Sequence, residues 1–141
     1  MPKSTPFVKF SHGSITTPGL FTMGKALSVG ETSKNYYKGK VIILVNEVTL
    51  SQAEYTAMAL RVAPEAIVLG STTSGADGNV KQITLPGGIN TLISGIVVYY
   101  PDGRETQRVG IIPDVEVLPS INGILTNRDD LLNKAIEIIL K

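Results

Sequence analysis

The residues with the clearest potential for chemistry lie where a buried strand is expected to lead into a helix. An apolar, β-branched run, Val41–Val45, stops at Asn46-Glu47, and Ser51 follows just before a helix-forming run that begins at Gln52. This arrangement presents one hydroxyl beside the free backbone N–H groups of a helix N-terminus. It predicts that Ser51 is a nucleophile for acyl transfer, with the Gln52 N–H as an oxyanion donor.

A structural role explains the same serine. The stretch Ser51-Gln52-Ala53-Glu54 fits the capping-box pattern, in which a serine precedes a glutamate by three residues. Such a cap stabilises a helix by about 1 kcal/mol and has no catalytic meaning. The pattern alone favours the cap. The two roles are compatible, because both place the serine at the start of the helix.

A serine nucleophile also needs a base, and the composition limits which residue could serve. The chain has one histidine, His12, and no cysteine. His12 lies in a segment without regular periodicity, so the sequence predicts a solvated side chain rather than a catalytic base. The absence of cysteine excludes disulfides, thiolate chemistry and cysteine-ligated zinc. The pattern indicates no cofactor and no metal site.

Length and charge narrow the class of protein. The chain has 141 residues, 13 of them basic and 12 acidic, with a net charge of +1. One domain with its own core is expected. The balanced charge argues against nucleic acid or an anionic membrane as a partner, and no apolar run approaches the ~20 residues of a membrane span. The N-terminal residues lack the apolar segment of a secretory signal.

The expected elements fall into two parts. Residues 1–39 are rich in proline and glycine and predict an irregular arm with one short strand at residues 7–10. Residues 40–141 begin with a strand–helix–strand unit: Val41–Val45, covered on both faces, then Gln52–Ala63 and Ala66–Leu69.

The remaining pattern predicts a mixed sheet and a C-terminal helix. A loop of small and polar residues spans Gly70–Asn79. Strands are expected at Val80–Leu85, Thr91–Tyr100, Arg104–Val109 and Asp114–Leu118, and a final helix at about Arg128–Leu140. The fold class is therefore α/β.

The stretch from Asn46 to Glu54, NEVTLSQAE, resembles the nucleophile motif of the carboxyl-terminal processing peptidases, also called tail-specific proteases. The following strand and loop, Val68 to Gly75, resemble the next segment of that family. Pro101-Asp102-Gly103 and the stretch Gly110–Asp114, GIIPD, resemble two later landmarks. These four landmarks occur in the family's order and at its spacing, which makes the resemblance more specific than any single motif.

This resemblance implies a crotonase-like or Clp-protease-like α/β core and a serine endopeptidase that acts on proteins or peptides. Ser51 would form the acyl-enzyme, and the Gln52 N–H would bind the oxyanion. Residues 40–141 would be the C-terminal part of the protease domain, with residues 1–39 as an arm. The family also suggests a periplasmic or cell-envelope setting.

The chain departs from the family at the position of the general base. The family uses a lysine in the loop after the second strand, with a glutamine four residues later; with one inserted residue, Asp77 and Lys81 occupy these positions. Lys81 could be a base if burial beside Ile83 and Leu85 lowered its pKa; otherwise it is a solvated strand lysine. Asp77 is either a base or a turn residue before Gly78. A branch of the family that resembles the tricorn-protease core uses a histidine far upstream of the serine and a glutamate; His12 is too close to Ser51 for that position, so in this branch the base would lie outside the given sequence.

A second departure concerns the segment before the nucleophile. Family members carry there a strand and a Gly-Gly turn that supplies the second oxyanion donor, and residues 1–39 contain neither. We therefore expect a fragment of a larger protease, incomplete as supplied and inactive or weak alone. The missing strand would leave a sheet edge uncovered, so we expect a homodimer or the arm folded over that edge.

Two other functions use the same fold class. A non-catalytic relative would bind a peptide or a small apolar ligand, and the missing lysine favours this alternative. A crotonase-type acyl-CoA enzyme would need a pair of acid/base carboxylates, and the sequence shows no convincing pair. The retained Ser51 favours the peptidase.

Overall fold

The computed structural model describes all 141 residues. Its first sheet is parallel, in the order β4 (Ile42–Val45), β5 (Ile67–Gly70) and β9 (Val115–Glu116). Helix α1 (Gln52–Arg61) connects β4 to β5, which pair in register from Ile42 opposite Ile67. The expected strand–helix–strand unit and the α/β class are thus confirmed.

The second sheet is antiparallel and is built around β1 (Thr5–Gly13). One edge of β1 pairs with β8 (Ile96–Tyr99), and the other pairs with β2 (Phe21–Met23) and β3 (Leu27–Val29). The strand expected at residues 7–10 is confirmed as part of β1, but β2 and β3 show that the rest of residues 1–39 is not irregular throughout. Their strands are fixed by pairing with β8, about 90 residues away, which a local pattern cannot reveal.

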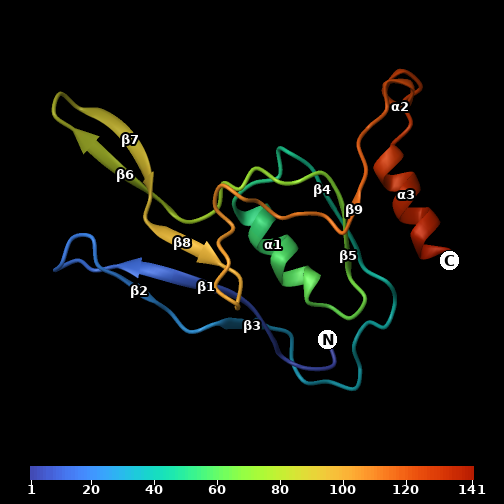
Figure 1. Ribbon diagram of the computed structural model, residues 1–141, viewed down its shortest axis with the longest axis horizontal. Coiled ribbons are helices and arrows are strands. Elements are labelled where there is room, and N and C mark those ends of the chain that lie inside the picture. The colour runs from blue at the N-terminus through green and yellow to red at the C-terminus, as the bar shows by residue number, and fades with distance from the viewer.

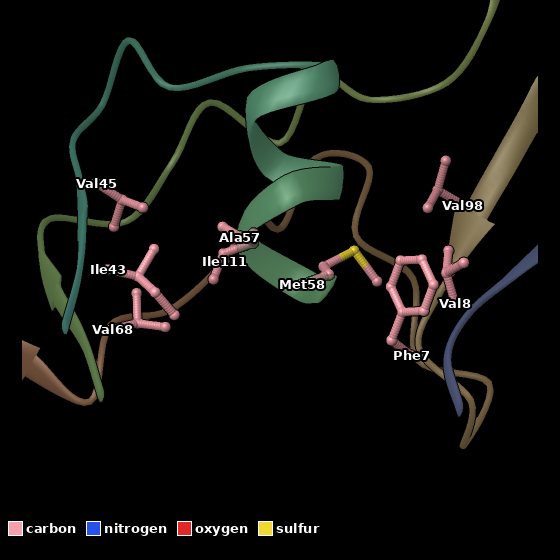
Figure 2. Close-up of a cluster of buried hydrophobic side chains, with 9 residues drawn as sticks. All are labelled: Phe7, Val8, Ile43, Val45, Ala57, Met58, Val68, Val98 and Ile111. Atoms are coloured by element: carbon pink, nitrogen blue, oxygen red, sulfur yellow. The ribbon is translucent and has the colours of Figure 1, made fainter. Parts of the chain in front are cut away.

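Helix α1 packs between the two sheets and forms the centre of the core (Figure 1). Figure 2 shows buried side chains of the parallel sheet on one side of α1 and those of β1 and β8 on the other, with Met58 pointing toward Phe7. The cluster consists of Phe7, Val8, Ile43, Val45, Ala57, Met58, Val68, Val98 and Ile111. Burial on two sides therefore stabilises α1 through tertiary packing.

The expected strand Thr91–Tyr100 is broken in two. Its first part, β7 (Ile89–Ser94), pairs with β6 (Val80–Leu85) in a hairpin that projects from the body of the molecule (Figure 1). Its second part is β8, in the sheet with β1. The break lies at Gly95, which has no side chain to hold the strand in one sheet.

Three further differences concern the C-terminal third. The expected strand Arg104–Val109 is a turn-rich segment with a single bridge from Glu105 to Tyr99. The short helix α2 (Ile121–Leu125) was not expected. Helix α3 (Asp130–Ile139) confirms the predicted terminal helix, but on its apolar face only Ala135 is fully buried.

Strand β4 lies at the edge of its sheet. Helix α3 packs against β4 and β5, and the Lys40 ammonium donates to the Ile138 carbonyl at its C-terminus, at 2.9 Å. Leu44 is still 42% exposed, so the expectation that this strand is covered on both faces is wrong. Residues 1–39 pair with β8 and not with β4. A homodimer through the β4 edge stays a prediction.

No helix of the structure is long and apolar enough to cross a bilayer.

Candidate active site

Ser51 occupies the N-cap of α1 with an unusual backbone conformation. Its φ is 54° and its ψ is −121°, a region that non-glycine residues enter only under strain. The Ser51 N–H donates to the Ala76 carbonyl at 2.8 Å. Although Ser51 and Glu54 have the layout of a capping box, the Ser51 hydroxyl makes no hydrogen bond to the first turn. The hydrogen bonds of its backbone N–H, to Ala76 and to the Glu54 carboxylate, therefore hold the serine in this conformation.

The backbone N–H of Gln52 is free. The first intrahelical donors that find acceptors are Ala53, which donates to Leu50 O at 3.1 Å, and Tyr55, which donates to Ser51 O at 3.0 Å. Unpaired N–H groups at a helix N-terminus attract negative charge. The residue directly after Ser51 thus offers a donor to an oxyanion formed beside the serine.

Glu54 holds the loop that faces the serine. Its side chain is fully buried, yet each carboxylate oxygen accepts two hydrogen bonds. One oxygen accepts from the Thr73 hydroxyl and from the Gly75 N–H, the latter at 2.9 Å. The other accepts from the N–H groups of Ser51 and Ala76, at 3.3 and 3.1 Å. A buried carboxylate satisfied in this way fixes the serine and the loop relative to each other.

A second set of contacts makes the loop pack tightly. Gly75 has a φ of 63°, and a Cβ there would lie 2.8 Å from the Gly110 nitrogen. The Thr73 hydroxyl accepts from the Ile111 N–H at 2.7 Å. The resembled landmark at residues 110–114 therefore supports the loop from behind and does not enter the site.

A cavity of about 290 Å³ lies beside Ser51. It is lined by Phe10, Ser51, Gln52, Tyr55, Asp77, Gly78, Asn79, Ile96 and Val98. Tyr55 stacks on Phe10 with ring centroids 6.2 Å apart, so the aromatic wall comes from α1 and β1 together. The cavity thus joins the serine to the second sheet.

Asp77 is the only ionisable carboxyl group in the lining of this cavity. It is 7% exposed; one oxygen accepts from the Gly78 N–H at 2.7 Å, and the other, Oδ2, is buried without any partner. Burial raises the pKa of the Asp77 carboxyl, against the lowering effect of the Gly78 N–H, and the Glu54 charge raises it further. An unpaired buried carboxylate oxygen is rare and calls for an explanation.

The structure does not bring the other sequence candidates to this cavity. Lys81 is exposed on β6, opposite Ile93, and is absent from the lining. Ile83 and Leu85 are 41% and 44% exposed, so the expected burial of Lys81 beside them is not found. His12 is exposed on β1 opposite Ile96, in a strand rather than the expected loop.

The sequence missed the positioning role of Glu54, which it identified only as a capping partner, and the walls from Phe10 and Tyr55. The burial of Glu54 against a distant loop left no local signal. No group of three or more His, Cys, Asp or Glu residues could hold a metal ion.

A larger cavity, of about 580 Å³, lies at the other end of α1. There the Arg61 guanidinium bridges the Ile112 carbonyl, at 2.9 Å, and the Asp114 carboxylate, whose second oxygen accepts from the Val68 N–H at 2.8 Å. These charged groups are paired with each other and with backbone. This end of α1 contains no counterpart of Ser51.

The family model described as peptidase family S41 matches residues 10–117. The chain belongs to peptidase family S41. This confirms the resemblance to the carboxyl-terminal processing peptidases, and the match includes most of the residues before β4 as well as the serine motif. Among curated proteins, no match to the chain was found.

Solved structures of S41 proteases share the fold. A Parabacteroides merdae protein described as a peptidase superposes with a TM-score of 0.88 at 22% identity, over 100% of this chain and 44% of that one. Mature CPAF complexed with lactacystin gives 0.70 at 19% identity, over 84% of this chain and 24% of that one. The photosystem II D1 C-terminal processing protease gives 0.54 at 18% identity, over 82% and 28%. The chain thus spans a quarter to a half of the length of these structures.

Proposed function

We propose that this chain carries the nucleophile of an S41 serine endopeptidase and that Ser51 forms the acyl-enzyme. The observation that carries the proposal is the strained backbone of Ser51, with φ 54° and ψ −121°, beside a free Gln52 N–H and a cavity. Strain at a non-glycine residue persists only where the surroundings impose it, and such residues cluster at functional sites.

In the proposed reaction the Ser51 Oγ attacks the carbonyl carbon of a peptide bond. The carbonyl oxygen becomes negatively charged and accepts a hydrogen bond from the Gln52 N–H, which is aligned with the positive end of α1. The amine leaves with a proton, and water then hydrolyses the ester. The second oxyanion donor is not assigned to a residue of this chain. A substrate peptide would align by strand addition, with one side chain in the cavity beside Ser51.

A second function is favoured by the position of Lys81. Because this lysine is exposed outside the cavity, the usual lysine base has no equivalent beside Ser51. A non-catalytic relative would use the same cavity to bind a peptide or a small apolar ligand. It would keep the fold without acylation of Ser51.

Labelling with a fluorophosphonate probe separates the two functions. Because the second oxyanion donor is unassigned, we expect the 141-residue chain to be labelled slowly, and the Ser51→Ala variant to lose labelling entirely. Ser28→Ala, which removes an exposed hydroxyl on β3, serves as the matched control and should label like the parent chain. If the parent chain is unlabelled, or if Ser51→Ala is labelled equally, the peptidase proposal for this chain is wrong.

A further inference from the structure

Two polar groups suited to exchange a proton line one cavity. The Ser51 hydroxyl makes no cap hydrogen bond, and the Oδ2 atom of Asp77 is buried without a partner. Both residues line the same 290 Å³ space, and no other carboxylate and no lysine or histidine does. A hydroxyl that must lose a proton and a carboxylate able to accept one therefore belong to residues that border the same space.

We propose that Asp77 is the general base for Ser51, in place of the lysine or histidine that serine peptidases more often use. This inference rests on the proposed function of Ser51 and adds the residue that accepts its proton.

The backbone around Asp77 is held firmly enough to orient its carboxylate. The Ser51 N–H donates to Ala76 O at 2.8 Å, which ties the serine to the residue before Asp77. The Gln107 side chain donates to the Asp77 carbonyl at 2.7 Å, and the Gly78 N–H fixes one carboxylate oxygen. A Cβ at Gly78 would lie 2.7 Å from Ile96 O, so the loop lies directly against β8. The oxygen left over, Oδ2, is the one available for the serine proton.

The proposed step conserves atoms and charge. As the Ser51 Oγ forms a bond to the carbonyl carbon, its proton passes to the Asp77 carboxylate, which becomes a neutral carboxylic acid. That acid then gives the proton to the leaving amine as the C–N bond breaks. In deacylation Asp77 takes a proton from water and returns it to the Ser51 Oγ. Catalytic hydrogen bonds are often longer in a free enzyme and shorten when substrate binds.

The groups around Asp77 favour this role. Burial raises the pKa of its carboxyl from the ordinary value of 3.8, and the neighbouring Glu54 charge acts in the same direction. A carboxylate whose pKa is raised toward the working pH is a stronger base than an exposed aspartate. Tyr55 on α1 is the other titratable group in the lining, and His12 lies on β1, two residues beyond Phe10.

The test is the rate of fluorophosphonate labelling of Ser51 as a function of pH. The variants are made in a His12→Gln background, which removes the only histidine. Asp77→Asn keeps an oxygen to accept from the Gly78 N–H but cannot take a proton. We expect it to label about 100-fold more slowly or worse, and Asp77→Glu to stay within about tenfold of the parent. Asp102→Asn, an exposed carboxylate in a turn, is the matched control and should not change the rate.

The pH profile distinguishes a base from a merely structural residue. In the parent the labelling rate should fall at acidic pH as Asp77 becomes protonated, with a midpoint above pH 3.8. The labelling rate of Asp77→Asn should not show this fall. Equal rates for Asp77→Asn and the parent would overturn the inference and leave the Ser51 proposal standing. Loss of labelling in Lys81→Gln with normal labelling in Asp77→Asn would assign the base to Lys81 instead. An unlabelled parent chain would contradict both proposals.

Discussion

The two ends of α1 carry cavities of opposite character. At the C-terminal end a space of about 580 Å³ is bordered by Arg61 and Asp114, whose charged groups are paired. At the N-terminal end a space of about 290 Å³ is bordered by Ser51 in a strained backbone and by Asp77 with an unpaired oxygen. The smaller cavity is thus bordered by a strained residue and by an unpaired carboxylate oxygen, and the larger one by an ion pair.

This difference indicates a structural role for the C-terminal end of α1 and a reactive role for its N-terminal end. Paired groups such as Arg61 and Asp114 attach a helix to the loop behind it and gain nothing from a ligand. Unpaired or strained groups raise the free energy of the fold and persist where another requirement retains them. Volume alone would have pointed to the wrong end of the helix.

Substitution of Glu54 should have the largest effect, because its four hydrogen bonds hold the N-terminal end of α1 and the facing loop together. Glu54→Ala should lower the free energy of unfolding by about 3 kcal/mol or more, since it leaves buried donors unpaired. Glu54→Gln retains one acceptor oxygen and should fall between this variant and the parent. Urea denaturation measures both. Equal stability of Glu54→Ala and the parent would show that the network is not structural.

Arg61 tests the other end. Arg61→Ala removes the contacts to Ile112 and Asp114 and should cost about 1–2 kcal/mol of stability, because the pair is partly exposed. The fluorophosphonate labelling rate of the folded variant should equal that of the parent. A matching fall in that rate would mean that the two ends of α1 are coupled, contrary to the separation described above.

The smallest expected effect concerns Asp77 and stability. Because the pKa of its carboxyl is raised in the folded chain, stability is lost as pH rises from the unfolded value near 3.8 through the folded value. Asp77→Asn does not suffer this loss, so it should be more stable than the parent at pH 7, by less than the effect of Arg61→Ala. Below the ordinary pKa of an aspartate the two proteins should have similar free energies of unfolding. A difference that does not change with pH in urea titrations would speak against a strained Asp77 charge.

Much of the parallel unit could be predicted from sequence, because its signals are local. The apolar run before Asn46, the helix formers after Ser51 and the stop at Pro64 lie within one continuous stretch. The second sheet could not be predicted, because β1 pairs with β8 across most of the chain. Gly95 divides an apparently continuous strand between two sheets, and only the final pairing shows where it breaks.

The candidate site likewise contains residues with local sequence signals and residues without them. Ser51 and Gln52 were identified from adjacent residues, and the structure places them at a helix N-terminus as that pattern requires. The choice between Asp77 and Lys81 depended on side-chain placement. Lys81 follows Asp77 by four residues, but it lies on an exposed hairpin while Asp77 lines the cavity. Sequence spacing alone could not separate a buried loop residue from an exposed strand residue.

Peptide mapping by mass spectrometry after fluorophosphonate treatment tests the central claim most directly. The claim is that the strained residue at the start of α1 is the reactive one. A single adduct on the peptide that contains Ser51, absent after prior unfolding in urea, is the predicted result. No adduct, or adducts spread over other serines and equal in the folded and unfolded chain, would contradict the account.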